Sequence, residues 1–165
     1  MEALMSTPVS IWEILAGKLV PYFILGMGSL IVCVAFSIII FEVPFQGSFW
    51  LLFVVSSLFL YAALSLGLLI STLAKNQFVA SQTALYSAFL PAFLLSGFIF
   101  EIDSMPIALQ FLSYLLPAKY FVKNLQTLFL AGNVYKLIFI NCLGILIIGT
   151  VFLTLILRKT RKRLD

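Results

Sequence analysis

The chain has 165 residues, of which 63% are hydrophobic and 10% are charged, and its formal net charge is +4. Soluble domains contain roughly 45–50% apolar and about 25% charged residues, so this composition excludes an ordinary soluble domain and indicates an integral membrane protein. Because a spanning helix needs about 20 residues, the chain has room for about four spans and for no separate soluble domain.

The segment 1–17 predicts an amphipathic helix that lies along the membrane surface. Ser10 is a good N-cap, and Glu13 stands three residues later, as a capping box requires. Thr7 and Pro8 end any earlier turn, because the residue before a proline is pushed out of the helical backbone region. A frayed terminus is the alternative interpretation.

The next two apolar runs are each long enough to cross a bilayer. Residues 18–41 amount to about 36 Å of helix, and Pro21 falls in the first turns, where a proline costs least. A turn-rich loop at 42–48 follows. The second span is expected at 49–73 and begins with Trp50 at the interfacial position that amphipathic rings prefer.

The third predicted span, 78–100, combines small and polar residues. Small side chains recur at every fourth position, at Ala80, Ala84, Ala88, Ala92 and Ser96. The first half also carries Ser81, Gln82, Thr83, Tyr86 and Ser87. Polar groups in lipid need partners inside the protein, so we expect this helix in a bundle or against a second subunit, where it either lines a transport pathway or holds helices together. Pro91 is expected to kink it.

Two short helices, at about 105–116 and 118–130, are predicted before the last span. The apolar part of the first, from Ile107 to Leu116, is about 15 Å long, half of a bilayer core, and is therefore expected to be re-entrant or interfacial. Pro117 separates the two. The second helix has Lys119, Lys123, Gln126 and Thr127 on one face and apolar residues on the other. That pattern is typical of an amphipathic helix at the membrane–water interface.

The last span is expected at 134–157, and a basic tail follows at 158–165. A nucleic-acid partner is one interpretation of the tail, but a juxtamembrane anchor on the cytoplasmic side is favoured. Four spans place both termini and the turn at residue 75 on the same side. That side carries most of the basic residues, so both termini are expected to be cytoplasmic. These residues are Lys18, Lys75, Arg158, Lys159, Arg161, Lys162 and Arg163.

Few residues suggest catalysis or cofactor binding. The chain contains no histidine and no Gly-x-x-x-x-Gly-Lys-[Ser/Thr] phosphate loop, and Cys33 and Cys142 lie inside apolar runs. Glu101 and Asp103 form a carboxylate pair that fits acid–base chemistry or a cation site, but solvated acids that cap the next helix are favoured. We therefore expect no cofactor, no metal and no enzyme activity, and any nucleotide energy must come from a partner chain.

Two blocks of sequence carry a family resemblance. The first runs from Met1 to Val9 and from Trp12 to Lys18, and the second comprises Leu95 to Phe100, Met105-Pro106 and Leu116 to Phe121. In this order they resemble the cytoplasmic coupling segment, and the outer region near the last span, of ABC-2 type transporter permeases. The resemblance covers nearly the whole chain.

The resemblance implies the permease part of an ATP-binding-cassette exporter in the bacterial inner membrane. Its partners would be a cytoplasmic ATPase, a second permease copy and membrane lipid, with no nucleic acid. It implies ATPase coupling at Glu2, Thr7, Pro8, Glu13 and Lys18. It implies an outer gate, hinged at Pro117, that contains Gly97, Pro106, Pro117, Lys119 and Tyr120. The residues expected in helix packing or the pathway are Ala80, Gln82, Ala84, Ala88, Ala92 and Ser96.

The predicted fold is an all-α integral membrane protein with four transmembrane helices, an N-terminal coupling helix and two short helices before the last span. Because family members usually have further spans ahead of the coupling segment, the chain is expected to be the C-terminal portion of a longer permease. A structural or regulatory membrane subunit is the alternative function, favoured by the row of small residues. A membrane-embedded enzyme using Glu101 and Asp103 is a more distant one.

Overall fold

The computed structural model describes residues 11–74 and 76–161, and within them every regular element is a helix. Four helices are long and apolar enough to cross a membrane, at Ala16–Ile39, Phe49–Leu73, Gln77–Leu95 and Tyr135–Arg158. The predicted all-helical class with four spans is therefore confirmed. Helix α1 covers Ile11–Ile39 without interruption, so the described end of the predicted surface helix is continuous with the first span. Pro21 therefore lies inside the helix and not in its first turns as predicted, because the helix begins ten residues earlier.

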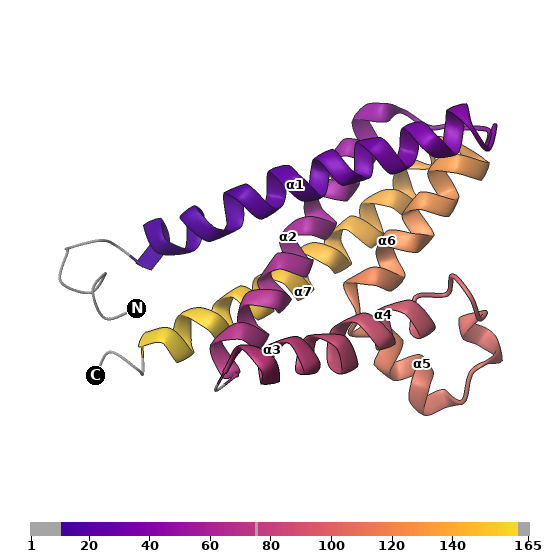
Figure 1. The fold of residues 1–165 in the computed structure, drawn as a ribbon. Coiled ribbons are helices and arrows are strands. Elements are labelled where there is room, and N and C mark those ends of the chain that lie inside the picture. The colour runs from indigo at the N-terminus through magenta and orange to yellow at the C-terminus, as the bar shows by residue number, and fades with distance from the viewer. Residues whose placement is uncertain (1–10, 75, 162–165) are drawn as a thin grey trace.

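Helices α2 (Phe49–Leu73) and α7 (Tyr135–Arg161) form the centre of the bundle and run in parallel (Figure 1). They approach closely at Gly149, where an added Cβ would lie 2.8 Å from Tyr61 Cε1 and 3.1 Å from Ala62 Cα. Helix α1 packs antiparallel to α2, with Gly26 against the side chain of Leu60. Glycines in spans permit such contacts because they carry no side chain.

The third span is one helix with a wider turn inside it. It consists of α3 (Gln77–Ala84), the π-turn η2 (Leu85–Phe89) and α4 (Leu90–Leu95). The N–H of Leu90 donates to the carbonyl of Leu85, five residues earlier. Pro91 follows directly, and a proline cannot donate the usual helical bond. The helix ends at Leu95, before the predicted end at Phe100, because Gly97 takes a φ of 84° that few other residues adopt.

A helical hairpin occupies the space between the third and last spans. After the short 3₁₀ turn η3 (Ile102–Ser104), α5 (Ile107–Tyr114) leads to a corner, and α6 (Pro117–Gln126) continues through the π-turn η4 (Thr127–Ala131). Helix α6 runs antiparallel to α7, towards the end of the bundle that holds the α1–α2 loop (Figure 1). We call this end the distal end; it is formed by residues 40–48 and 131–134.

The distal end is closed by contacts between two loops. The backbone N–H of Ser48 donates to Asn133 Oδ1 over 2.8 Å. An added Cβ at Gly47 would lie 2.8 Å from the carbonyl oxygen of Leu128, so the two backbones touch. Beneath them lies a buried cluster of Leu52, Val55, Leu128 and Ile138. The end of α6 is thereby fixed to the first turns of α2 and α7.

Candidate functional site

The corner between α5 and α6 holds a buried cation. Lys119, in the first turn of α6, has only 9% of its surface exposed. Its Nζ donates to Ser113 Oγ over 3.3 Å and lies 3.1 Å from the centroid of the Tyr114 ring. A cation over an aromatic face is attracted by the negative potential of the ring. The ammonium is thus held by a hydroxyl and an aromatic ring, both from α5 and both neutral.

Further contacts fix the corner around Pro117. The Tyr120 hydroxyl donates to the carbonyl of Tyr114 over 3.1 Å, and the ring of Tyr120 packs where Gly144 on α7 has no side chain. Ser113 Oγ donates to the carbonyl of Gln110 over 2.7 Å. Pro117 occupies the start of α6, where its missing N–H leaves no helical bond unmade. The bonds from Lys119 to Ser113 and from Tyr120 to Tyr114 therefore join the two helices across Pro117.

The predicted gate residues fall into two groups. Pro117, Lys119 and Tyr120 lie together at the corner. Gly97 and Pro106 lie in the segment that connects α4 to α5, Gly97 just past the end of α4 and Pro106 at the N-cap of α5. The sequence did not indicate that Ser113 and Tyr114 are the partners of Lys119. Their spacing of five and six residues across a proline is a signal that could have suggested it.

The prediction that Lys119 shares a wet face with Lys123 is wrong. Lys123 and Gln126 are exposed, whereas Lys119 is buried. The reason is that α6 packs against both α2 and α7, with Phe121 stacked on Phe59 of α2 at 4.1 Å between ring centroids. A helix held on two sides has little surface left for water at the end that lies inside the bundle.

A second buried polar cluster joins α6 to α7, and the sequence prediction missed its role. The side-chain amide of Asn141 donates to Asn124 Oδ1 over 3.0 Å, and Asn124 Nδ2 lies 3.7 Å from Cys142 Sγ. Asn124 is fully buried. Polar side chains between helices in lipid contribute to their association. Asn141 follows the apolar run 137–140 in the last span, and an amide in such surroundings is the signal that could have revealed a partner.

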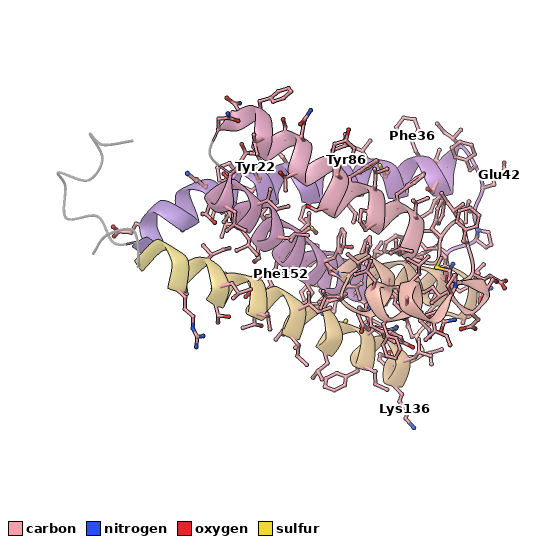
Figure 2. All side chains as sticks on the ribbon, turned by 90° about the horizontal axis from the view of Figure 1, so that it is seen from below. Tyr22, Phe36, Glu42, Tyr86, Lys136 and Phe152 are labelled. Carbon is pink, nitrogen blue, oxygen red and sulfur yellow. The ribbon has the colours of Figure 1, made fainter. Side chains whose placement is uncertain are left out.

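The row of small residues and the polar residues of the third span lie on different faces. Ala80, Ala84, Ala88 and Ala92 are half-buried and Ser96 is buried. Gln82 is exposed, and so is Tyr86, which Figure 2 labels. The row of small residues therefore faces the other helices of this chain, whereas Gln82 and Tyr86 face away from them.

Most of the predicted coupling residues lie outside the described residues. These are Glu2, Thr7 and Pro8, together with the N-cap Ser10. Glu13 and Lys18 lie on the first turns of α1, and both are exposed. The turn residue Lys75 and the end of the basic tail, 162–165, are also outside the described part.

The two acids before α5 do not cap it. Glu101 and Asp103 are exposed, as predicted, but the N-cap position is occupied by Pro106, which makes no side-chain capping bond. The Gln110 side chain instead turns back and donates to the carbonyl of Met105 over 2.9 Å. The capping prediction is therefore wrong, because proline fixes the start of α5.

One apolar groove lies between α1 and α2, with a volume of about 470 Å³. Its walls include Met27, Val34 and Phe53. Apolar walls offer no polar group to orient a ligand, whereas binding sites combine apolar surface with a few placed polar groups. The corner of the hairpin is the stronger candidate site.

Four apolar spans around a hairpin with buried polar groups define a multi-pass membrane protein. The chain belongs to the ABC-2 type transporter family, whose model matches residues 1–130. This confirms the resemblance found in the sequence.

Three relatives from Escherichia coli give the range of similarity. The chain is 49% identical over 165 residues, all of its length, to "Probable multidrug ABC transporter permease YbhS", of which it covers 44%. It is 30% identical over 133 residues, 79% of its length, to "Probable multidrug ABC transporter permease YbhR", of which it covers 35%. It is 27% identical over 168 aligned positions, 98% of its length, to "Inner membrane transport permease YhhJ", of which it covers 43%. The chain thus spans less than half the length of these relatives. No solved structure matches it.

Proposed function

We propose that the chain is the permease part of an ABC exporter, which forms a translocation pathway in the membrane and couples to a separate cytoplasmic ATPase. The family match over residues 1–130 carries this proposal. It is supported by relatives named as permeases that align along the whole chain or nearly so. ATP would be hydrolysed by the partner, since the sequence has no phosphate-binding loop.

Coupling to the ATPase is proposed at Glu2, Thr7, Pro8, Glu13 and Lys18. The support from the fold is that α1 is unbroken from Ile11 through the first span. A displacement at Glu13 would therefore be carried into the span along one helix, with Pro21 in its interior as the position where the helix can bend. The same segment is the first block of the family resemblance.

A second permease copy is proposed to face the third span. Gln82 and Tyr86 are exposed on this chain, although the helix that carries them is apolar enough to lie in the membrane. Polar groups facing lipid are unfavourable, so a wet pathway or another subunit is expected to cover them. The small-residue row on the opposite face is proposed to hold α3 and α4 against their own bundle.

The gate is proposed at the α5–α6 corner, within the outer half of a bacterial inner membrane. The orientation rests on the basic residues near the start of α1 and the end of α7, which the positive-inside rule assigns to the cytoplasm. The distal end, with Glu42 and Lys136 near it (Figure 2), would then face outward.

Co-purification with the cognate ATPase tests the proposal in the full-length permease. Replacement of Glu2 to Glu13 by a Gly/Ser linker of equal length is expected to abolish ATPase association. The control replaces the basic tail, 158–165, by a linker in the same way and is expected to retain association. Unchanged ATPase binding after the first replacement would disprove the coupling assignment and favour a structural or regulatory subunit.

A further inference from the structure

Lys119 lies near the middle of the membrane-embedded part of the bundle. The adjacent Tyr120 packs on Gly144, nine residues after the start of α7 at Tyr135, which corresponds to about 13 Å of helix. Phe121 stacks on Phe59, ten residues after the start of α2 at Phe49, which corresponds to about 15 Å. A bilayer core is about 30 Å thick, so two independent helices place the corner at about half depth.

At this depth the positive charge of the Lys119 ammonium has only neutral partners in the described part of the chain. It carries three N–H donors, and among the described residues it uses one of them, to the neutral Ser113 hydroxyl. Tyr114 covers another side with its ring. The acid Asp103, which precedes α5, and the cation Lys123, one turn further along α6, are both exposed. A cation in a low-dielectric site with neutral partners has a strong affinity for an anion.

Closing the corner does not require this charge. The neutral Tyr120 hydroxyl already donates to the carbonyl of Tyr114 across the corner, and the Ser113 hydroxyl has a second, neutral partner within α5, the carbonyl of Gln110. Burying a charge costs a fold free energy unless the charge is paired, and the partners of Lys119 among the described residues are neutral. A functional role of the charge therefore explains the lysine at position 119 better than a structural role does. Ionisable residues inside a membrane commonly mark pathways for ions or substrates.

The Tyr114 ring is the side chain that would have to move for an anion to reach Lys119 Nζ. It covers the ammonium on one side and is itself 56% exposed at the surface of this chain. A rotation of this one side chain would uncover Nζ without unfolding either helix. An anion is least stable at the middle of a bilayer. A cation at that depth therefore lowers the free-energy barrier to the passage of an anion at its highest point.

We propose that Lys119 is a binding site for the anionic headgroup, a carboxylate or a phosphate, of an amphiphilic compound, with Tyr114 as its cover. The inference deepens the proposed permease function, because the bound compound would be a transported one. Binding itself needs no ATP. A failure of the transport assignment would therefore leave the binding result intact, and the two can be told apart.

Electron spin resonance of the full-length permease in phosphatidylcholine vesicles tests the proposal. The probes are stearic acid with a spin label near the end of its chain and the methyl ester of the same compound, at a pH where the acid is ionised. The protein-restricted fraction gives the association constant of each. We expect the acid to bind about tenfold more strongly than the ester. Lys119→Met should remove the preference, and Lys119→Arg should retain it.

Matched variants separate a headgroup site from other effects. Lys123→Met removes an exposed cation one turn away and should leave the preference unchanged. Ser113→Ala removes the hydrogen bond but not the charge and should also preserve it; if Lys119→Met does not fold, Lys119→Gln replaces it. Spin-labelled phosphatidylglycerol against phosphatidylcholine shows whether a lipid phosphate binds in the same way. An anion preference of either kind that depends on Lys119 supports the site. A preference that survives in the neutral variants, or is absent from the wild type, overturns it.

Discussion

The side-chain amide of Asn141 on α7 donates to Asn124 Oδ1 on α6 over 3.0 Å, and this bond joins two helices at a place where neither asparagine reaches water. Asn124 Nδ2 also lies 3.7 Å from Cys142 Sγ, so one residue on α6 meets two consecutive residues on α7. The pair fixes the height at which the hairpin sits along the last span.

Asn124→Leu is expected to destabilise the permease by about 1–3 kcal/mol, because the amide of Asn141 loses its acceptor in a buried site. The double variant Asn124→Leu with Asn141→Leu should lose less than the sum of the two single variants. The expected coupling is about 0.6 kcal/mol and at most about 1.7 kcal/mol, the mean and the maximum for interhelical hydrogen bonds in membranes. Equilibrium unfolding in mixed micelles measures all three. Gln126→Leu, at an exposed position on α6, is the control, and strictly additive losses would refute the bond.

Gly149→Ala is expected to destabilise the α2–α7 contact by about 1–3 kcal/mol, as overpacking does. The new methyl group would sit 2.8 Å from Tyr61 Cε1 and 3.1 Å from the backbone Cα of Ala62, and the backbone cannot move aside easily. Gly67→Ala on α2 meets nothing within 4 Å and should leave the melting temperature unchanged or raise it slightly. Thermal unfolding in detergent compares the two. Equal melting temperatures would show that α2 and α7 are not this close.

Tyr120→Phe removes only the hydroxyl that bonds the carbonyl of Tyr114. One hydrogen bond contributes about 0.5–1.5 kcal/mol, so hydrogen exchange of the Leu115 and Leu116 amides at the corner should rise by up to about tenfold. Tyr135→Phe, at an exposed tyrosine, is the matched control. Exchange at the corner that is the same in both variants would mean that the hydroxyl does not hold α5 to α6.

Pro117→Ala is expected to leave the fold stable, because proline at the first position of a helix contributes no N–H bond that alanine must replace. Its effect on export therefore reports on movement at the corner. A hinge at Pro117 predicts reduced export with unchanged melting temperature. Full export in this variant would mean that α5 and α6 move as one body. The bonds that Lys119 and Tyr120 make to α5 favour such a joint movement.

Gln82→Cys, in a background without Cys33 and Cys142, is expected to react with a water-soluble maleimide if the exposed face of α3 lines a wet pathway. Ala88→Cys, half-buried on the opposite face, should be protected. Ile24→Cys on α1, 63% exposed, controls for a residue that faces lipid, where the reagent cannot reach. Protection of Gln82→Cys to the same degree as Ile24→Cys would remove Gln82 from the pathway.

The spans follow from the sequence because long apolar runs have one way to satisfy their backbone in lipid. Small residues at every fourth position predict one packing face on the third span, and in the structure Ala80, Ala84, Ala88 and Ala92 on this face are half-buried; their role in packing stays a prediction. The π-turn at Leu85–Phe89 could not be predicted from the sequence, because a single proline is compatible both with a kink and with a widened turn.

The site was harder to predict because a helical wheel records direction but not depth. Lys119 and Lys123 share a face of α6, yet one is buried and the other exposed. The difference comes from the tertiary position of the helix: its first turn lies inside the bundle and its last turns approach the distal end. Only the packing of Phe121 on Phe59 and of Tyr120 on Gly144 reveals that depth.

The bond between the Ser48 N–H and Asn133 Oδ1 joins residues 85 positions apart in the chain. If the distal end faces outward as proposed, Asn133 reaches Ser48 only when the last span, which begins two residues later at Tyr135, enters the bilayer. During biogenesis the three described spans that precede α7 would therefore be inserted before the distal end is joined. Joining of the distal end then becomes the final step that commits the protein to its native form.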